Sequence, residues 1–177
     1  MEEKEYRLKY GRGEVRFSLP EEQVYLEILG KEYPGLQDVS AEIRSALERP
    51  VDAPPLQELL RPADRVVISV SDITRSWQRM DLVLPTLFHT LSQAGLSEDH
   101  ITVLIAVGGH RFNSQAEMEQ LCGKEICGRV KVVNHDARDL KNMVYLGKTS
   151  RGTEVAINRL AAEADRIILT GGIIYHY

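Results

Sequence analysis

The sequence has few cysteines, no long hydrophobic run and no basic excess, and each of these absences excludes a class of protein. Cys122 and Cys127 are too few for a disulfide scaffold, which favours reduced thiols in a cytoplasmic protein. No apolar run is long enough for a membrane span, and the charged amino terminus lacks the apolar region of a secretory signal. A net charge of -4 argues against a nucleic-acid-binding protein.

Common nucleotide and zinc motifs are also missing. Gly108-Gly109 and Gly171-Gly172 do not form the three spaced glycines that open a dinucleotide-binding helix, and no lysine-containing phosphate loop is present. The two cysteines do not have zinc-finger spacing, and no second ligand pair lies near them. With 43% hydrophobic and 27% charged residues, the 177-residue chain has the composition of a globular domain with a real core.

Hydrophobic patterning predicts strands that alternate with helices. Apolar residues that alternate on both sides of Gly11-Arg12-Gly13 predict a β-hairpin, and Ser150-Arg-Gly152 lies between the strands of a second one. Continuous apolar runs predict four buried strands, at 65–70, 101–107, 130–134 and 166–170. Helical patterns are found at 40–49, 82–94, from 114 to about 122, and 159–164.

Buried strands separated by helices are typical of a parallel sheet that is covered on both faces. We therefore expect an α/β fold with a Rossmann-like, mostly parallel sheet, helices on both faces and two β-hairpin decorations. Residues 1–37 would form the first hairpin and a lead-in, and residues 38–177 the α/β core. Because the chain stops just past a strand, where another helix usually follows, we expect a fragment of a longer protein; a natural short protein is the alternative.

Polar side chains follow each predicted strand. Asp72 and Arg75 follow the first strand, His110 the second, His135 the third and His176 the fourth. Since ligands of open α/β sheets bind at the carboxyl ends of the strands, we expect these side chains at one edge. Histidine exchanges protons near neutral pH and arginine binds carboxylates with two hydrogen bonds. The pattern therefore favours proton transfer on a small anionic substrate.

Structural roles compete with this interpretation. Asp72 is equally suited to capping the helix that follows the first strand, with Arg75 as its partner. His110 and His176 are equally suited to structural roles in turns.

The remaining candidates favour structural roles more clearly. His135 has a local partner in Asp136, which favours a structural role. His89 lies inside a predicted helix and His100 at the start of a strand, so both are expected to be packing or surface residues. Trp77 is compatible with a wall of the substrate pocket or with ordinary packing.

Several segments, taken in order, resemble the nickel-dependent lactate racemases, which carry a nickel-pincer nucleotide. The resemblance covers nearly the whole chain and corresponds to the amino-terminal domain of that family. The segments that carry it include Val70-Ser-Asp-Ile-Thr-Arg75, Val107-Gly-Gly-His-Arg111, Val133-Asn-His-Asp-Ala137, Thr149-Ser-Arg-Gly-Thr153 and Gly172-Ile-Ile-Tyr-His-Tyr177.

The resemblance implies a racemase or epimerase of small 2-hydroxy acids. In such enzymes the cofactor takes a hydride from the carbon that bears the hydroxyl, and histidines move the hydroxyl proton. His110 and His176 would be the catalytic bases, one for each enantiomer. Arg75 would bind the substrate carboxylate, and Asp72 would help to position the cofactor or the site. The family places its cofactor-linked lysine and a nickel-binding histidine after Tyr177, so no residue of this chain is implied as a metal ligand.

The chain departs from the family pattern at two places. Ser76-Trp77 follows Arg75 where the family usually has proline, and Gly109 stands where a larger residue usually precedes the first catalytic histidine. Both changes predict an altered substrate pocket. Without the family's carboxyl-terminal domain, the chain alone is expected to be free of cofactor and inactive, and an oligomer is compatible with its uncovered sheet edge.

Two other functions stay open at this point. The first is a non-catalytic module of the same fold that binds a small anion or carboxylate. The second is a zinc hydrolase that uses these histidines, which needs ligands converging on one metal. The identity of the hydroxy acid also stays open, because lactate, malate and larger acids all fit the pattern.

Overall fold

The computed structural model describes residues 2–31 and 33–174 and divides into two units, Met1–Gly35 and Leu36–Tyr177. The first unit is the hairpin predicted from its alternating pattern: β1 (Glu3–Tyr10) pairs antiparallel with β2 (Gly13–Pro20), and the one-turn helix η1 (Glu21–Gln23) follows. Its turn uses Gly11 at a φ of 59°, a conformation that favours glycine. Tyr6 and Phe17 stack across the strands with ring centroids 5.6 Å apart.

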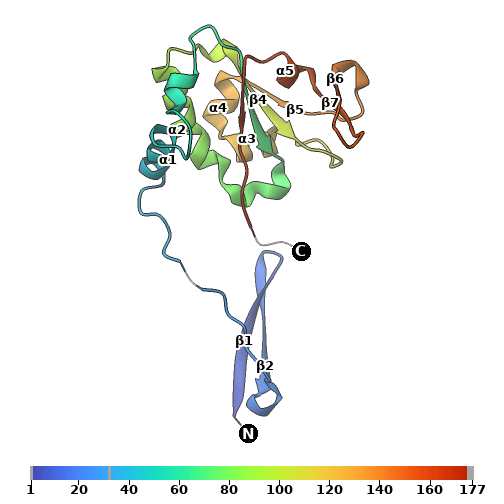
Figure 1. Ribbon diagram of the computed structural model, residues 1–177. Coiled ribbons are helices and arrows are strands. Elements are labelled where there is room, and N and C mark those ends of the chain that lie inside the picture. The colour runs from blue at the N-terminus through green and yellow to red at the C-terminus, as the bar shows by residue number, and fades with distance from the viewer. Residues whose placement is uncertain (1, 32, 175–177) are drawn as a thin grey trace. The chain divides into compact units, whose positions relative to one another are not determined.

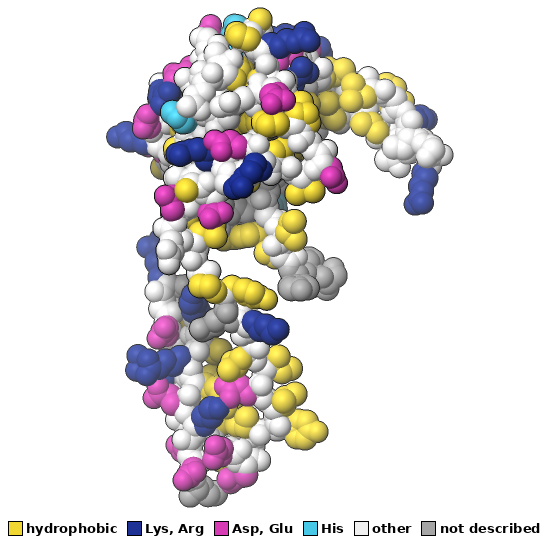
Figure 2. Space-filling view, turned by 60° about the vertical axis from the view of Figure 1, so that its left-hand side comes forward, with side chains coloured by type: hydrophobic (Ala, Val, Ile, Leu, Met, Phe, Trp, Pro, Cys, Tyr) yellow, Lys and Arg dark blue, Asp and Glu magenta, His cyan; other side chains and the backbone are white. Residues whose placement is uncertain are grey.

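The hairpin exposes much of its apolar surface. Leu8, Tyr10, Val15 and Phe17 are all exposed, and Figure 2 shows hydrophobic side chains along one side of this unit. An isolated two-stranded hairpin is marginally stable in water. We therefore expect the hairpin to depend on further apolar contacts for its stability.

The second unit holds the α/β core. Its strands are β3 (Val66–Ser71), β4 (Ile101–Ala106), β5 (Lys131–Asn134), β6 (Met143–Lys148), β7 (Glu154–Asn158) and β8 (Arg166–Leu169). Its α-helices are α1 (Val39–Glu48), α2 (Met80–Gln93), α3 (Gln115–Cys122), α4 (Lys124–Arg129) and α5 (Arg159–Ala162). Four short 3-10 helices complete it: η2 (Leu56–Leu59), η3 (Ile73–Gln78), η4 (Glu98–His100) and η5 (Leu140–Asn142).

The four predicted buried strands form one parallel sheet in the order β5-β4-β3-β8 (Figure 1). The register pairs Ser71 with Ala106 and Ile105 with Asn134, so the carboxyl ends of β3, β4 and β5 meet at one edge. From β3 the chain continues through β4 to β5 on one side of the sheet, whereas β8 pairs with β3 on the other side. Doubly wound folds bind their ligands where the strand order reverses in this way, outside the carboxyl ends of the strands.

The hydrophobic core lies on one face of this sheet. Alternate side chains of the two central strands point into it, and α2 covers them with Leu84, Leu87 and Leu91, all buried. The strand residues of this face are Val66, Ile68, Val70, Ile101, Val103 and Ile105. Helices α3 and α4 extend the cover with Leu121 and Ile126.

The opposite face has less cover among the described residues. Leu160 of α5 lines small cavities there with Val67, Thr102 and Val133. Ile167 and Leu169 of β8 remain exposed. Figure 1 shows α5 and the β6–β7 hairpin close together at one end of the sheet.

The fold class predicted from sequence is confirmed: a mixed α/β unit with a parallel sheet and two antiparallel hairpins. Helix α3 begins where the sequence predicts it, because Ser114 and Glu117 form a complete capping box. Helix α4 was not predicted, since its six residues are too short for a periodic pattern. None of the helices between residues 2 and 174 is long and apolar enough to cross a membrane.

Candidate functional site

A buried carboxylate binds a histidine at the carboxyl edge of the sheet. Asp72 follows β3 and is only 4% exposed, whereas the His110 side chain, from the loop after β4, is 56% exposed. The His110 Nδ1 lies 2.5 Å from Oδ2 of Asp72. The buried carboxylate therefore holds one ring nitrogen, while more than half of the imidazole side chain stays exposed.

Thr74 holds the other oxygen of this carboxylate. The backbone N–H of Thr74 donates to Oδ1 of Asp72 at 3.1 Å, and the Thr74 hydroxyl donates to the same atom at 2.5 Å. Burial alone raises the pKa of Asp72, but the hydrogen bonds from Thr74 and His110 outweigh it and lower the pKa below its usual value. Asp72 is therefore ionised at neutral pH.

Asp72 therefore has both roles: it caps a helix, as one interpretation of the sequence proposed, and it also contacts His110. Asp72 is the N-cap of η3, the 3-10 helix that carries Arg75. Arg75 is not the partner of Asp72: its guanidinium donates to the Thr74 hydroxyl at 3.2 Å and is exposed. It forms no ion pair with any described residue, so its charge is free to meet an anion.

A sharp turn presents His110. The His110 N–H donates to the carbonyl of Val107 at 3.0 Å, and Gly108 lies within this turn at a φ of 57°. A side chain at position 108 would be strained at this φ, which explains the first glycine of the pair.

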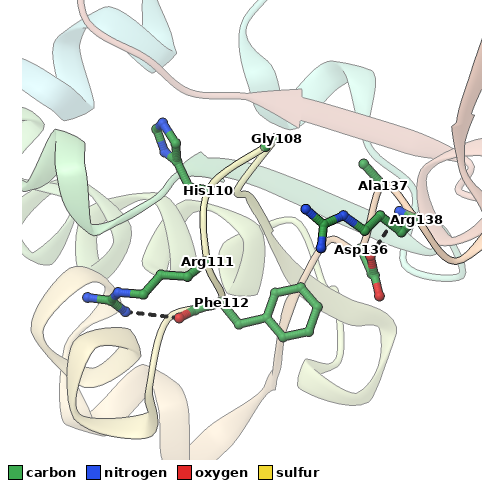
Figure 3. Close-up of a pocket in the computed structure, with 8 residues that line it drawn as sticks. Gly108, His110, Arg111, Phe112, Asp136, Ala137 and Arg138 are labelled. Atoms are coloured by element: carbon green, nitrogen blue, oxygen red, sulfur yellow. Dashed lines mark hydrogen bonds between the residues drawn. The ribbon is translucent and has the colours of Figure 1, made fainter.

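A cavity of about 440 Å³ lies between this loop and the loop that follows β5. Residues 108–112 line one side, and Asp136, Ala137 and Arg138 line the other. Figure 3 shows the Arg138 side chain extending from its own loop toward the loop of Gly108 and Phe112. The cavity is open and is large enough for a small organic acid. His110 is among its lining residues, and Figure 3 shows the imidazole ring on the side of the loop that faces away from Asp136.

Arg111 lines the cavity but is bound to a neighbouring helix. Its guanidinium binds both carboxylate oxygens of Glu117 at 2.7 and 2.8 Å, a bidentate pair. The Glu117 carboxylate also accepts from the N–H of Ser114 at 2.8 Å. Arg111 therefore anchors the His110 loop to α3.

This pair predicts a pH-dependent stability. The hydrogen bond from Arg111, followed by that from the Ser114 backbone, lowers the pKa of Glu117 from 4.5 to about 2. A lowered pKa in the folded state stabilises the protein above the unfolded pKa, and this stability is lost as the pH falls toward 2. Glu117→Gln should lower the melting temperature at pH 7, and the difference from wild type should shrink at pH 3. An equal difference at both pH values would contradict the ion pair.

The segment after β8 passes against the helix that carries Arg75. An added Cβ at Gly172 would lie 2.6 Å from the Trp77 ring, so the indole packs directly on this glycine. Trp77 therefore packs on Gly172 while it stays 47% exposed, so its role as a wall of a substrate pocket stays a prediction. His176 lies outside the described residues, and its catalytic role stays a prediction.

The other histidines have structural surroundings. The side-chain amide of Asn158 donates to Nδ1 of His135 at 3.0 Å, so the partner of His135 is Asn158 and not Asp136, as the sequence had suggested. Asp136 instead accepts from the backbone N–H of Arg138. His89 is exposed on α2.

Sequence reasoning missed two asparagines beside the site. Asn113 is 4% exposed and joins Asn134, the last residue of β5, through several hydrogen bonds. Asn113 also accepts from the backbone N–H of Ile73. The signal that could have found them is position, since Asn134 ends one predicted strand and Asn113 lies in the loop that follows another.

No metal site is formed by the described residues. Between residues 2 and 174 no three His, Cys, Asp or Glu side chains lie close enough to hold one ion together, so the zinc-hydrolase alternative has no support there. Both cysteines are free thiols. Burial, followed by the neighbouring Cys127, raises the pKa of Cys122 to about 12, so this thiol is unreactive at neutral pH.

A histidine–carboxylate pair and an exposed guanidinium lie at the carboxyl edge of a parallel sheet, where open α/β folds bind their ligands. Comparison with known proteins then identifies the family. Residues 10–177 match the family model described as the lactate racemase N-terminal domain, so the chain belongs to the lactate racemase family.

Two curated relatives are named lactate racemase. The protein from Thermoanaerobacterium thermosaccharolyticum is 31% identical over 172 residues, which cover 96% of this chain and 40% of the relative. The protein from Lactiplantibacillus plantarum is 31% identical over 135 residues, which cover 76% of this chain and 31% of the relative. The chain thus spans less than half the length of either relative.

A solved structure agrees with the fold. The lactate racemase apoprotein from Thermoanaerobacterium thermosaccharolyticum superposes with a TM-score of 0.80 at 28% sequence identity. The match covers 94% of this chain and 38% of that one.

Proposed function

We propose that this chain is the proton-transferring and substrate-orienting part of an enzyme that interconverts the enantiomers of a small 2-hydroxy acid. The observation that carries the proposal is the hydrogen bond between buried Asp72 and exposed His110. The matched relatives are lactate racemases, which supports this substrate class. The free thiols fit a cytoplasmic location, which we include in the proposal.

The chemistry of His110 follows from its partner. An ionised Asp72 can only accept, so it holds a proton on Nδ1 of His110. Nε2 then carries a lone pair and can take the hydroxyl proton of a substrate bound beside the exposed face of the ring. The imidazolium that forms is stabilised by the adjacent carboxylate, which makes the proton transfer easier.

A racemase needs a proton acceptor on each face of the substrate. We propose His176 as the second base, because its segment follows β8 and the described part of that segment passes against η3 at Gly172. Arg75 would then bind the carboxylate between the two bases. Asp72 would act through His110; a direct contact of Asp72 with a cofactor stays a prediction.

The hydride chemistry would come from a nickel-pincer nucleotide. The open space beside Gly109, where an added Cβ would meet nothing within 4 Å, leaves room for a bound group next to His110. None of the described residues forms a metal-binding set, so we assign no nickel ligand among them. A further domain would complete the site in the whole protein, because the relatives are more than twice as long as their matched regions.

Arg75→Ala should weaken substrate binding in the whole protein. Loss of a bidentate contact to a carboxylate is expected to raise KM by roughly 10- to 100-fold with a smaller effect on kcat. Arg44→Ala, which removes an exposed arginine from α1, is the matched control. An unchanged KM would remove Arg75 from the carboxylate site.

The test of the proposed function is an enantiomer assay on the full-length, cofactor-loaded protein. Single enantiomers of several 2-hydroxy acids are incubated with the protein, and both enantiomers are measured by chiral chromatography. We expect racemisation of at least one acid, with the hydrogen on the hydroxyl-bearing carbon retained in D₂O. Binding of these acids without any turnover would instead support a non-catalytic carboxylate-binding module.

A further inference from the structure

Asn113 is a buried polar side chain beside the site that bonds to two other segments. It lies three residues after His110 in the same loop and is buried. Its Oδ1 accepts from the backbone N–H of Ile73 at 3.0 Å. Its Nδ2 and its own backbone N–H both donate to Oδ1 of Asn134, at 2.7 and 3.0 Å. The side chain of Asn134 returns a bond from Nδ2 to the carbonyl of Asn113 at 3.0 Å.

These bonds join the segment after β3, the loop after β4 and the last residue of β5. Ile73 lies between Asp72, which binds His110, and Thr74, which binds the carboxylate of Asp72. Asn134 ends β5 and precedes the loop that forms the far wall of the cavity. Asn113 therefore connects the carboxylate, the loop of the base and the opposite wall through one side chain.

The arrangement needs an amide at position 113. The carbonyl oxygen serves the N–H of Ile73, while the amide nitrogen serves an oxygen of Asn134. A carboxylate of the same shape could accept from Ile73 but would face Oδ1 of Asn134 with a second acceptor. An alanine would leave the half-buried N–H of Ile73 and an oxygen of Asn134 without these partners.

We propose that Asn113 is a positioning residue that sets the geometry of the Asp72–His110 pair. The inference rests on the proposed function for its kinetic consequences. The structural consequences of the inference are independent of the proposed function, because the Asp72–His110 bond exists without substrate. Misplacement of a catalytic group by about 1 Å can cost 10²-fold in rate. A shift of the His110 loop relative to η3 is therefore expected to lower kcat more than it raises KM.

The test compares Asn113→Ala and Asn113→Asp with wild type in the full-length, cofactor-loaded protein. We expect kcat to fall by about 10- to 100-fold in Asn113→Ala with a smaller change in KM, and by less in Asn113→Asp, which keeps the acceptor for Ile73. Asn142→Ala, which removes an exposed asparagine from η5, is the control and should be near wild type. The loss should disappear in a His110→Asn background, because Asn113 acts through His110.

Nuclear magnetic resonance of the His110 ring separates this inference from the proposed function. Wild type should show a proton held on Nδ1 of His110. In both Asn113 variants the signal of this proton should be weaker, or the proton should exchange faster with solvent. If no 2-hydroxy acid is turned over, the proposed function fails while this readout still tests Asn113. Unchanged kcat and an unchanged His110 signal in the variants would overturn the inference, and Asn113→Asp provides both readouts if Asn113→Ala does not fold.

Discussion

His110→Asn is expected to lower kcat for racemisation in the whole protein by about 10²- to 10⁴-fold, the usual contribution of a general base. Asparagine places an N–H near the position of the imidazole Nδ1, so the bond to Asp72 can persist. It has no group at the position of Nε2, so the proton acceptor is lost. His110→Ala should lose activity as well, although it also removes the partner of Asp72. Initial rates from each enantiomer provide the measurement.

A matched substitution on the same fold serves as the control. His89 is exposed on α2 and has no part in the proposed site, so His89→Ala should keep wild-type kinetics. Circular dichroism and thermal unfolding should show that the His110 variants keep their fold. Near-normal turnover in His110→Asn would refute the role of His110 as a base. His176→Ala is expected to lose activity in the same assay, as required for a second base.

Asp72→Asn is expected to cost about 10²- to 10⁴-fold in kcat by reversing the tautomer of His110. Two donors from Thr74 require an acceptor at the Oδ1 position of residue 72. The amide nitrogen of an asparagine must then face Nδ1 of His110 and donate to it. The imidazole proton moves to Nε2, the nitrogen that should accept the proton of the substrate.

The measurement pairs kinetics with the ¹⁵N spectrum of His110. We expect a large fall in kcat together with a change from an Nδ1-protonated to an Nε2-protonated ring. Asp165→Asn is the control, because Asp165 binds Arg65 at the opposite edge of the sheet. Wild-type activity in Asp72→Asn would show that the carboxylate does not set the tautomer.

The sheet and one part of the site could be predicted from sequence because each depends on local patterns. The runs at 65–70 and 101–107 are continuous and β-branched, which is typical of buried parallel strands. Parallel strands end at a common edge, so Asp72, Arg75 and His110 were expected together there, and the structure places all three after β3 and β4.

What could not be predicted depends on contacts between distant segments. The bond between Asn113 and Asn134 spans 21 positions and has no periodic signal in either segment. The partner of His135 is 23 positions away, whereas the sequence suggested its neighbour Asp136. The bulge between Tyr145 and Gly147 likewise arises from pairing with β7 and not from a local motif.

The packing of Trp77 on Gly172 has an evolutionary consequence. A methyl group at position 172 would meet the indole ring well inside van der Waals contact, so a larger residue at 172 would force the indole of Trp77 to shift. Among relatives that have a smaller residue at position 77, substitutions at position 172 should be permitted. The two positions are therefore expected to vary as a pair, which an alignment of many homologues would reveal as covariation.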